Sequence, residues 1–263
     1  MNRVKVVRGI ISELANVDDA DNETKEEVYD RELSKIRNLK TNGILDDVVQ
    51  AVGSDKKRQR YAAFIFAELH DVAGIEKVFA ELLSSSDPDV RSSIIQSIGL
   101  RRMTSLVGAL NSHFEHETDQ FCRDRLLHAL AKIADESSLP IFLHLSTSLT
   151  NDHYLWVLCI AAINYRREEF RHFLNYIYSS PEKSKSIKIM AAWGLAKLGN
   201  LSAYDYLIQM LDDPVTIIHA DGVTTSDPGE SLRAAQAIAD INNWPFEWGS
   251  AEIAKIKRLV GDS

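Results

Sequence analysis

The side chains best suited to metal chemistry gather in one short segment, which contains His113, Glu115, His116, Glu117 and Asp119. Imidazole and carboxylate groups are common metal ligands, and residues four apart share one face of a helix. The same residue types also form ordinary solvated helix ends. The sequence favours that second interpretation, and we expect neither a metal nor another cofactor in this chain.

Other catalytic motifs are missing from the sequence. It has no glycine-rich phosphate loop, no Gly-x-Ser-x-Gly elbow and no Cys-x-x-Cys pair. His219 stands near Asp212 and Asp221 and could transfer protons, but a histidine in a loop is more often simply exposed. Cys122 and Cys159 fall within apolar helical stripes, which indicates buried, reduced thiols. We therefore expect a protein that is not an enzyme.

Polar and aromatic side chains recur at a regular spacing that suits protein binding. Each stands directly before a small or apolar residue of a repeat, or a few positions upstream of it. Tryptophan, tyrosine and arginine dominate the energetics of protein interfaces. The candidate binding residues are Arg60, Phe64, Gln96, Arg125, His128, Trp193 and Gln236. The alternative is that part of this set packs between neighbouring repeats.

The elements that position these residues form a repeat. A small residue followed by a large apolar one occurs at Ser97-Ile98, Ala129-Leu130, Ala162-Ile163, Gly194-Leu195 and Ala237-Ile238, after a less regular copy at Ile65-Phe66. The steps are 32 or 33 residues, except for a final step of 43. An Asp or Ser stands ten residues before each pair, at Asp55, Asp87, Asp119, Asp152, Ser184 and Asp227. A fixed period in this range indicates stacked structural units.

Each unit is expected to contain two short helices. Val90, Ile94 and Ile98 form one helical stripe, and the Asp or Ser would cap the start of the second helix. The extra residues of the last unit, within 213–229, have two β-branched runs around Asp221-Gly222, which predict a hairpin. Arg91 and Arg123, four residues after their Asp, are expected to tie adjacent repeats together.

The segment Asp87-Pro88-Asp89-Val90-Arg91, followed by Ser97-Ile98-Gly99, resembles the signature of bacterial HEAT-repeat proteins of the phycobilisome-lyase-like type. Residues 191–199 and 234–239 match its second half. The resemblance implies an all-α fold: a right-handed α-solenoid of about six helix pairs. It would form one domain, 1–263, with an N-terminal cap at 1–43, repeats at 44–243 and a C-terminal cap at 244–263. HEAT-repeat metal hydroxylases repeat a His-Glu pair in several units, whereas this chain has only His116-Glu117.

Composition narrows the class of partner. The 263 residues carry a net charge of −8, which argues against nucleic acid as a ligand because phosphate neutralisation needs a basic face. The acidic stretch from Asp18 to Glu32 would instead attract a basic partner. No apolar run approaches the length of a membrane span and no signal peptide is evident, so we expect a cytoplasmic protein that binds neither membranes nor nucleic acid.

Three functions compete on this evidence. The first is a non-enzymatic protein-binding scaffold that uses the concave face of the solenoid, with a toxin-neutralising immunity protein as one version because many nuclease toxins are basic. The second, implied by the family resemblance, is a lyase-like enzyme subunit related to bilin lyases. The third, nucleic-acid repair, conflicts with the net charge of −8. The scaffold is the function that the sequence favours.

Overall fold

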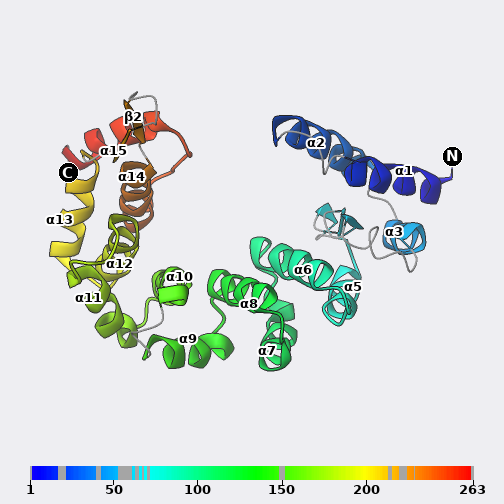
Figure 1. Cartoon of the computed structure of the whole chain (residues 1–263), viewed down its shortest axis with the longest axis horizontal. Coiled ribbons are helices and arrows are strands. Elements are labelled where there is room, and N and C mark those ends of the chain that lie inside the picture. The colour runs from blue at the N-terminus through cyan, green and yellow to red at the C-terminus, as the bar shows by residue number, and fades with distance from the viewer. Residues whose placement is uncertain are drawn as a thin grey trace. The chain divides into compact units, whose positions relative to one another are not determined.

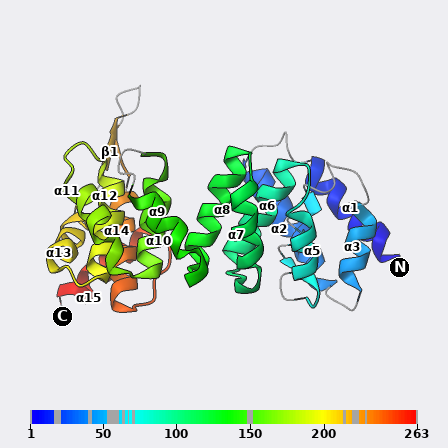
Figure 2. The same ribbon diagram turned by 90° about the horizontal axis from the view of Figure 1, so that it is seen from below.

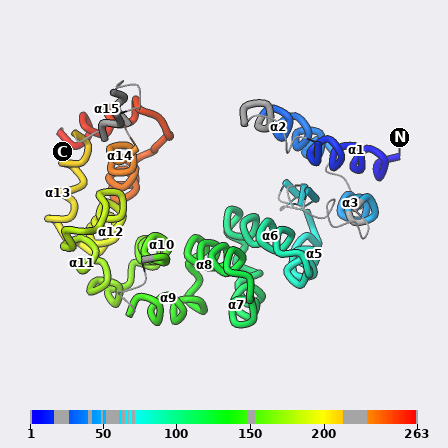
Figure 3. The backbone as a smooth tube through the Cα atoms, viewed as in Figure 1, coloured from blue at the N-terminus to red at the C-terminus, as the bar shows by residue number. Residues whose placement is uncertain are grey.

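The computed structural model describes residues 2–16, 22–39, 43–52, 61–62, 65–66, 68–69, 72–147, 152–212, 215–218, 224–227 and 229–261, and Figure 3 marks the remainder in grey. Arg60, Phe64, His219 and the predicted turn at Asp221-Gly222 lie outside these ranges. The chain divides into two compact units, the N-terminal unit Met1–Ser137 and the C-terminal unit Ser138–Ser263. The organisation as a single domain stays a prediction.

The N-terminal unit begins with three helices whose packing partners lie next to them in the chain. These are α1 (Arg3–Asn16), α2 (Asn22–Asn38) and α3 (Ile44–Val52), and α1 packs against both α2 and α3. Val7, Ile11 and Leu14 recur along one side of α1 and are fully buried. This apolar stripe explains why a helix with so many charged residues folds onto its neighbours.

Two helix pairs follow further along the N-terminal unit. They are α5 (Ile75–Leu82) with α6 (Pro88–Leu100), and α7 (Val107–His116) with α8 (Gln120–Ile133). The second helices, α6 and α8, lie side by side (Figure 1). Asp87 caps α6 by accepting from the Asp89 backbone N–H, and Asp119 caps α8 by accepting from the Cys122 N–H. These caps confirm the predicted starts of both helices.

The C-terminal unit repeats the same arrangement in three helix pairs. They are α9 (Leu139–Ser146) with α10 (Leu155–Tyr165), α11 (Arg171–Ser179) with α12 (Lys185–Lys197), and α13 (Leu201–Met210) with α14 (Gly229–Asn242). The second helix α12 lies between α10 and α14 (Figures 1 and 2). Ser184 caps α12 as predicted, but Asp152 belongs to a 3₁₀ turn and α10 starts later, at Leu155.

The predicted hairpin is present between α13 and α14. Strands β1 (Val215–Ile218) and β2 (Thr224–Asp227) pair antiparallel, from Val215 opposite Asp227 to Ile218 opposite Thr224. Asp227 therefore lies in a strand and not at the expected helix start. The last helix, α15 (Ser250–Gly261), packs against α14. Trp248, which belongs to the expected C-terminal cap at 244–263, is 63% exposed.

Small residues set the spacing between helices in both units. A methyl group added at Gly99 would lie 2.6 Å from the Cα of Ala129, and one at Gly194 would lie 2.9 Å from Leu174. Ser97, Ala129, Ala162 and Ala237 are all buried. The small positions of the repeat therefore sit at helix contacts, as the sequence pattern predicts. Among the described residues, no helix is long and apolar enough to cross a membrane.

Candidate functional site

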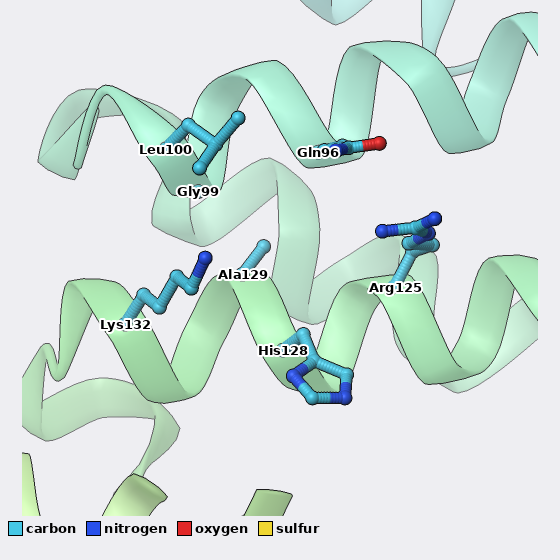
Figure 4. Close-up of a pocket in the computed structure, with 7 residues that line it drawn as sticks. All are labelled: Gln96, Gly99, Leu100, Arg125, His128, Ala129 and Lys132. Atoms are coloured by element: carbon cyan, nitrogen blue, oxygen red, sulfur yellow. The ribbon is translucent and has the colours of Figure 1, made fainter. Parts of the chain in front are cut away.

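A pocket between α6 and α8 gathers three of the predicted binding residues. Its volume is about 110 Å³, and its walls are formed by Gln96, Gly99, Leu100, Arg125, His128, Ala129 and Lys132 (Figure 4). Gly99 and Ala129 form its floor, because neither carries a side chain large enough to fill the space where the two helices come closest. The small residues that allow the helices to pack also leave this hollow.

The pocket is positively charged. The Arg125 guanidinium and the Lys132 ammonium both extend toward α6, on either side of Ala129 (Figure 4). No carboxylate among the described residues lies within ion-pair distance of either cation. The guanidinium carbon of Arg125 is 4.9 Å from the centre of the Phe121 ring, so an aromatic face partly supports this cation. Gln96, exposed on α6, adds an amide that can donate and accept hydrogen bonds.

His128 lies between the two cations on α8. Its partial burial, followed by the charges of Lys132 and Arg125, lowers its pKa below the ordinary value. Asp124 acts in the opposite direction, but more weakly. The imidazole is therefore neutral at pH 7, and it offers one nitrogen as donor and one as acceptor.

Apolar side chains flank the same two helices. Leu100 at the end of α6 is 58% exposed, and Phe121 at the start of α8 is 54% exposed.

We use the name α6–α8 face for the surface formed by Gln96, Leu100, Phe121, Arg125, His128 and Lys132. The sequence-based selection missed Leu100, Phe121 and Lys132. Lys132 could have been found from its helical spacing, since it stands four residues after His128 and seven after Arg125.

The remaining predicted residues are not part of this pocket. Arg60 and Phe64 lie outside the described residues, and Gln236 is half-buried on α14 in the C-terminal unit. Trp193 was expected to be a binding anchor. Its indole N–H instead donates to the Asp240 carboxylate at 2.7 Å, which joins α12 to α14. Its polar group is therefore already used for packing between repeats.

The second helices of the C-terminal unit are tied together by further polar contacts. Lys197, which is 7% exposed, pairs with the same Asp240 carboxylate. Arg233 of α14 donates to the Ser186 hydroxyl at 3.1 Å and lies 4.7 Å from the centre of the Trp156 ring of α10. We use the name α12–α14 face for Trp193, Lys197, Arg233 and Asp240. Its polar and charged groups largely satisfy one another.

The His/Glu segment contributes to structure in the N-terminal unit. Glu117 is buried and accepts two hydrogen bonds of 2.8 Å from Arg91, one from the Asp119 backbone N–H and a further contact from His113. Burial opposes ionisation of Glu117, but these partners outweigh burial and hold its pKa at about 2. Arg91 thus joins α6 to the segment that precedes α8, as expected. Within the described residues, no three potential metal ligands gather at one point.

The two cysteines are free and buried. Burial raises the pKa of the Cys122 thiol to about 12 and also raises the pKa of Cys159. A thiol is a poor nucleophile unless it ionises, so neither side chain is suited to covalent chemistry.

Comparison with protein families agrees with the paired helices. A family described as HEAT repeats matches residues 75–157, and one described as PBS lyase HEAT-like repeat matches residues 187–213. The chain is a HEAT-repeat protein. The first match spans α5 to the start of α10, and the second covers most of α12 together with α13. The matched segments thus lie on both sides of residue 137, and the first of them includes α6 and α8, the two helices that form the pocket.

Solved structures show weaker similarity. Human deoxyhypusine hydroxylase in complex with glycerol is 15% identical, with a TM-score of 0.38 over 99% of this chain and 96% of that chain. An engineered protein is 16% identical, with a TM-score of 0.41 over 97% of this chain and 72% of that chain. At these values neither protein informs the function of this HEAT-repeat protein. None of the curated proteins matches the chain in sequence.

Proposed function

We propose that this HEAT-repeat protein is a non-enzymatic scaffold that binds a protein partner on the α6–α8 face. The observation that carries the proposal is the convergence of Gln96, Arg125 and His128 on one open pocket. Exposed Leu100 and Phe121 flank it. Arginine and aromatic groups next to a small hollow are typical of interface hot spots.

The size and chemistry of the pocket favour binding over catalysis. A volume of about 110 Å³ is smaller than the several hundred Å³ that enclose a typical small-molecule ligand or cofactor. A catalytic histidine needs a group that orients it and a nucleophile or substrate proton within reach. His128 stands between two cations instead. The alternative, a lyase-like subunit that handles a tetrapyrrole, would require a larger cavity than this one.

The biological setting forms part of the same proposal. A cytoplasmic immunity protein that neutralises a toxin would use such a scaffold, and the net charge of −8 would speed its encounter with a basic partner. This attraction acts over the whole molecule, whereas the contacts in the pocket depend on local charge.

Site-specific photo-crosslinking in the source cell tests the scaffold. A photoreactive phenylalanine derivative replaces Gln96 on the α6–α8 face in one variant. In the matched control it replaces Lys77 of α5, whose side chain is 84% exposed. A partner that crosslinks at position 96 and not at position 77 supports the proposal. Equal crosslinking at both positions, or crosslinking at position 77 alone, would contradict it.

A further inference from the structure

We propose that the α6–α8 pocket binds a carboxylate side chain from an acidic segment of the partner protein, between Arg125 and Lys132. This inference rests on the scaffold function proposed above and names the chemistry that its binding surface recognises. It differs from the expectation of a basic partner, because the local charge of the pocket is opposite in sign to the net charge of the chain.

The charge of the pocket supports an anionic ligand. Within the described part of the chain, two nearby arginines have carboxylate partners: Arg91 pairs with Glu117, and Arg101 lies 3.5 Å from Glu68. Arg125 and Lys132 have no carboxylate partner among the described residues. A carboxylate placed between them would form charge-assisted hydrogen bonds, which are stronger than neutral ones. Gln96, which lines the pocket from α6, can donate one more hydrogen bond to the same group.

The dimensions of the pocket indicate how much of the partner enters it. About 110 Å³ accommodates one side chain and not a folded element. Arg125 and Lys132 are two helical turns apart, which corresponds to about 10 Å along α8. An extended segment covers this distance in about three residues. The exposed side chains of Leu100 and Phe121 would then contact apolar residues next to the carboxylate.

The net charge argues for a short acidic segment rather than a long polyanion. A nucleic acid needs a continuous row of cations, and repulsion from a chain of net charge −8 grows with each added phosphate. One or two carboxylates are matched by the two cations of the pocket. At physiological ionic strength, acidic residues of the chain that lie more than about 8 Å from the pocket are largely screened. They therefore do not prevent a short acidic segment from binding there.

Peptide binding to the full chain tests the inference. The probe is a fluorescein-labelled peptide that contains Glu-Leu pairs separated by glycine, and its counterpart carries Gln in place of Glu. We expect the Glu peptide to bind, and the double variant Arg125→Gln/Lys132→Gln to weaken this binding at least about tenfold. The control variant Lys188→Gln/Arg258→Gln has the same net charge, places both changes outside α6 and α8, and should bind like the wild type. Circular dichroism checks that both variants are folded.

Three results would overturn the inference. The Gln peptide could bind as tightly as the Glu peptide, or both double variants could lose binding equally, which would indicate a general charge effect. A single-stranded oligothymidylate could bind more tightly than the Glu peptide and lose binding in the pocket variant, which would assign the pocket to phosphates. If crosslinking at position 96 still captures a partner, the scaffold proposal stands even when the carboxylate inference fails.

Discussion

The α6–α8 face and the α12–α14 face are formed by corresponding helices of the repeat, yet they use their polar groups differently. On the α12–α14 face, Trp193 and Lys197 both bind Asp240, which ties two helices together. On the α6–α8 face, Arg125 and Lys132 surround an open pocket. The buried ion pair of the N-terminal unit, between Arg91 and Glu117, does not involve the α6–α8 face.

This difference shows that a repeat position does not by itself define a role. His128 and Trp193 occupy equivalent places, each directly before a small residue. His128 lines the pocket, whereas Trp193 is held by a neighbouring helix. The deciding factor is whether the next repeat supplies a polar partner such as Asp240. Stability and binding can therefore be separated by substitutions in the two units.

The largest expected effect is on the stability of the N-terminal unit. Arg91→Ala removes the arginine from a nearly buried ion pair and leaves the Glu117 carboxylate with only the Asp119 backbone N–H and His113 as partners, which should cost about 3–5 kcal/mol. Urea unfolding measures this loss. Lys77→Ala, which removes an exposed lysine from α5, should change stability by less than about 0.5 kcal/mol and is the control. If Arg91→Ala lowers the free energy of unfolding by less than about 1 kcal/mol, the ion pair with Glu117 does not contribute much to stability.

The same ion pair predicts sensitivity to acid. The pKa of Glu117 is about 2 in the folded chain, against an ordinary value of 4.5. A carboxyl group with a lowered folded-state pKa stabilises the fold above its ordinary pKa, and this contribution disappears as the pH falls from 4.5 towards 2. The difference corresponds to about 3 kcal/mol. Unfolding measured between pH 5 and pH 2 should therefore show a steeper loss in the wild type than in Glu117→Gln.

Overpacking the small positions distinguishes the two units. Ala129→Leu would collide with Gly99 and also fill the floor of the pocket, whereas Gly194→Leu would collide with Leu174 away from it. Both should cost about 1–3 kcal/mol in urea unfolding. Only Ala129→Leu should also abolish binding of the Glu-Leu peptide. If Gly194→Leu reduces binding to the same extent, the pocket is not the binding site.

The smallest expected effects come from two conservative substitutions, one at a structural residue and one at a binding residue. Trp193→Phe removes the N–H donated to Asp240 and should cost about 1 kcal/mol, with peptide binding unchanged. Arg125→Gln should lower stability by less than about 0.5 kcal/mol and still weaken peptide binding. If peptide binding is lost in Trp193→Phe alone, the α12–α14 face is the binding surface and the proposed roles of the two faces are wrong.

Much of the fold could be predicted because it depends on local rules. The period of the small residues predicted the helix pairs, and the Asp or Ser upstream predicted the caps at Asp87, Asp119 and Ser184. Asp227 did not follow the rule because it pairs with Val215 in the inserted hairpin. Asp152 did not follow it either, since a 3₁₀ turn precedes α10.

The candidate site could be predicted only in part. Gln96, Arg125 and His128 were selected because polar residues line the second helices, and the structure brings them together. The role of Trp193 depends on Asp240, which is 47 residues away in the sequence. No local pattern indicates a contact over that separation. The exposure of Leu100 and Phe121 likewise depends on which elements cover α6 and α8, and a helical stripe does not contain that information.

Hydrogen–deuterium exchange of the full chain, with and without the Glu-Leu peptide, tests the central claim most directly. The account predicts slower exchange within residues 88–133, which include α6 and α8, and unchanged exchange within residues 185–242, which include α12 and α14. Protection of residues 185–242 with no change in 88–133 would contradict it, because binding would then use the face that we assign to packing between repeats.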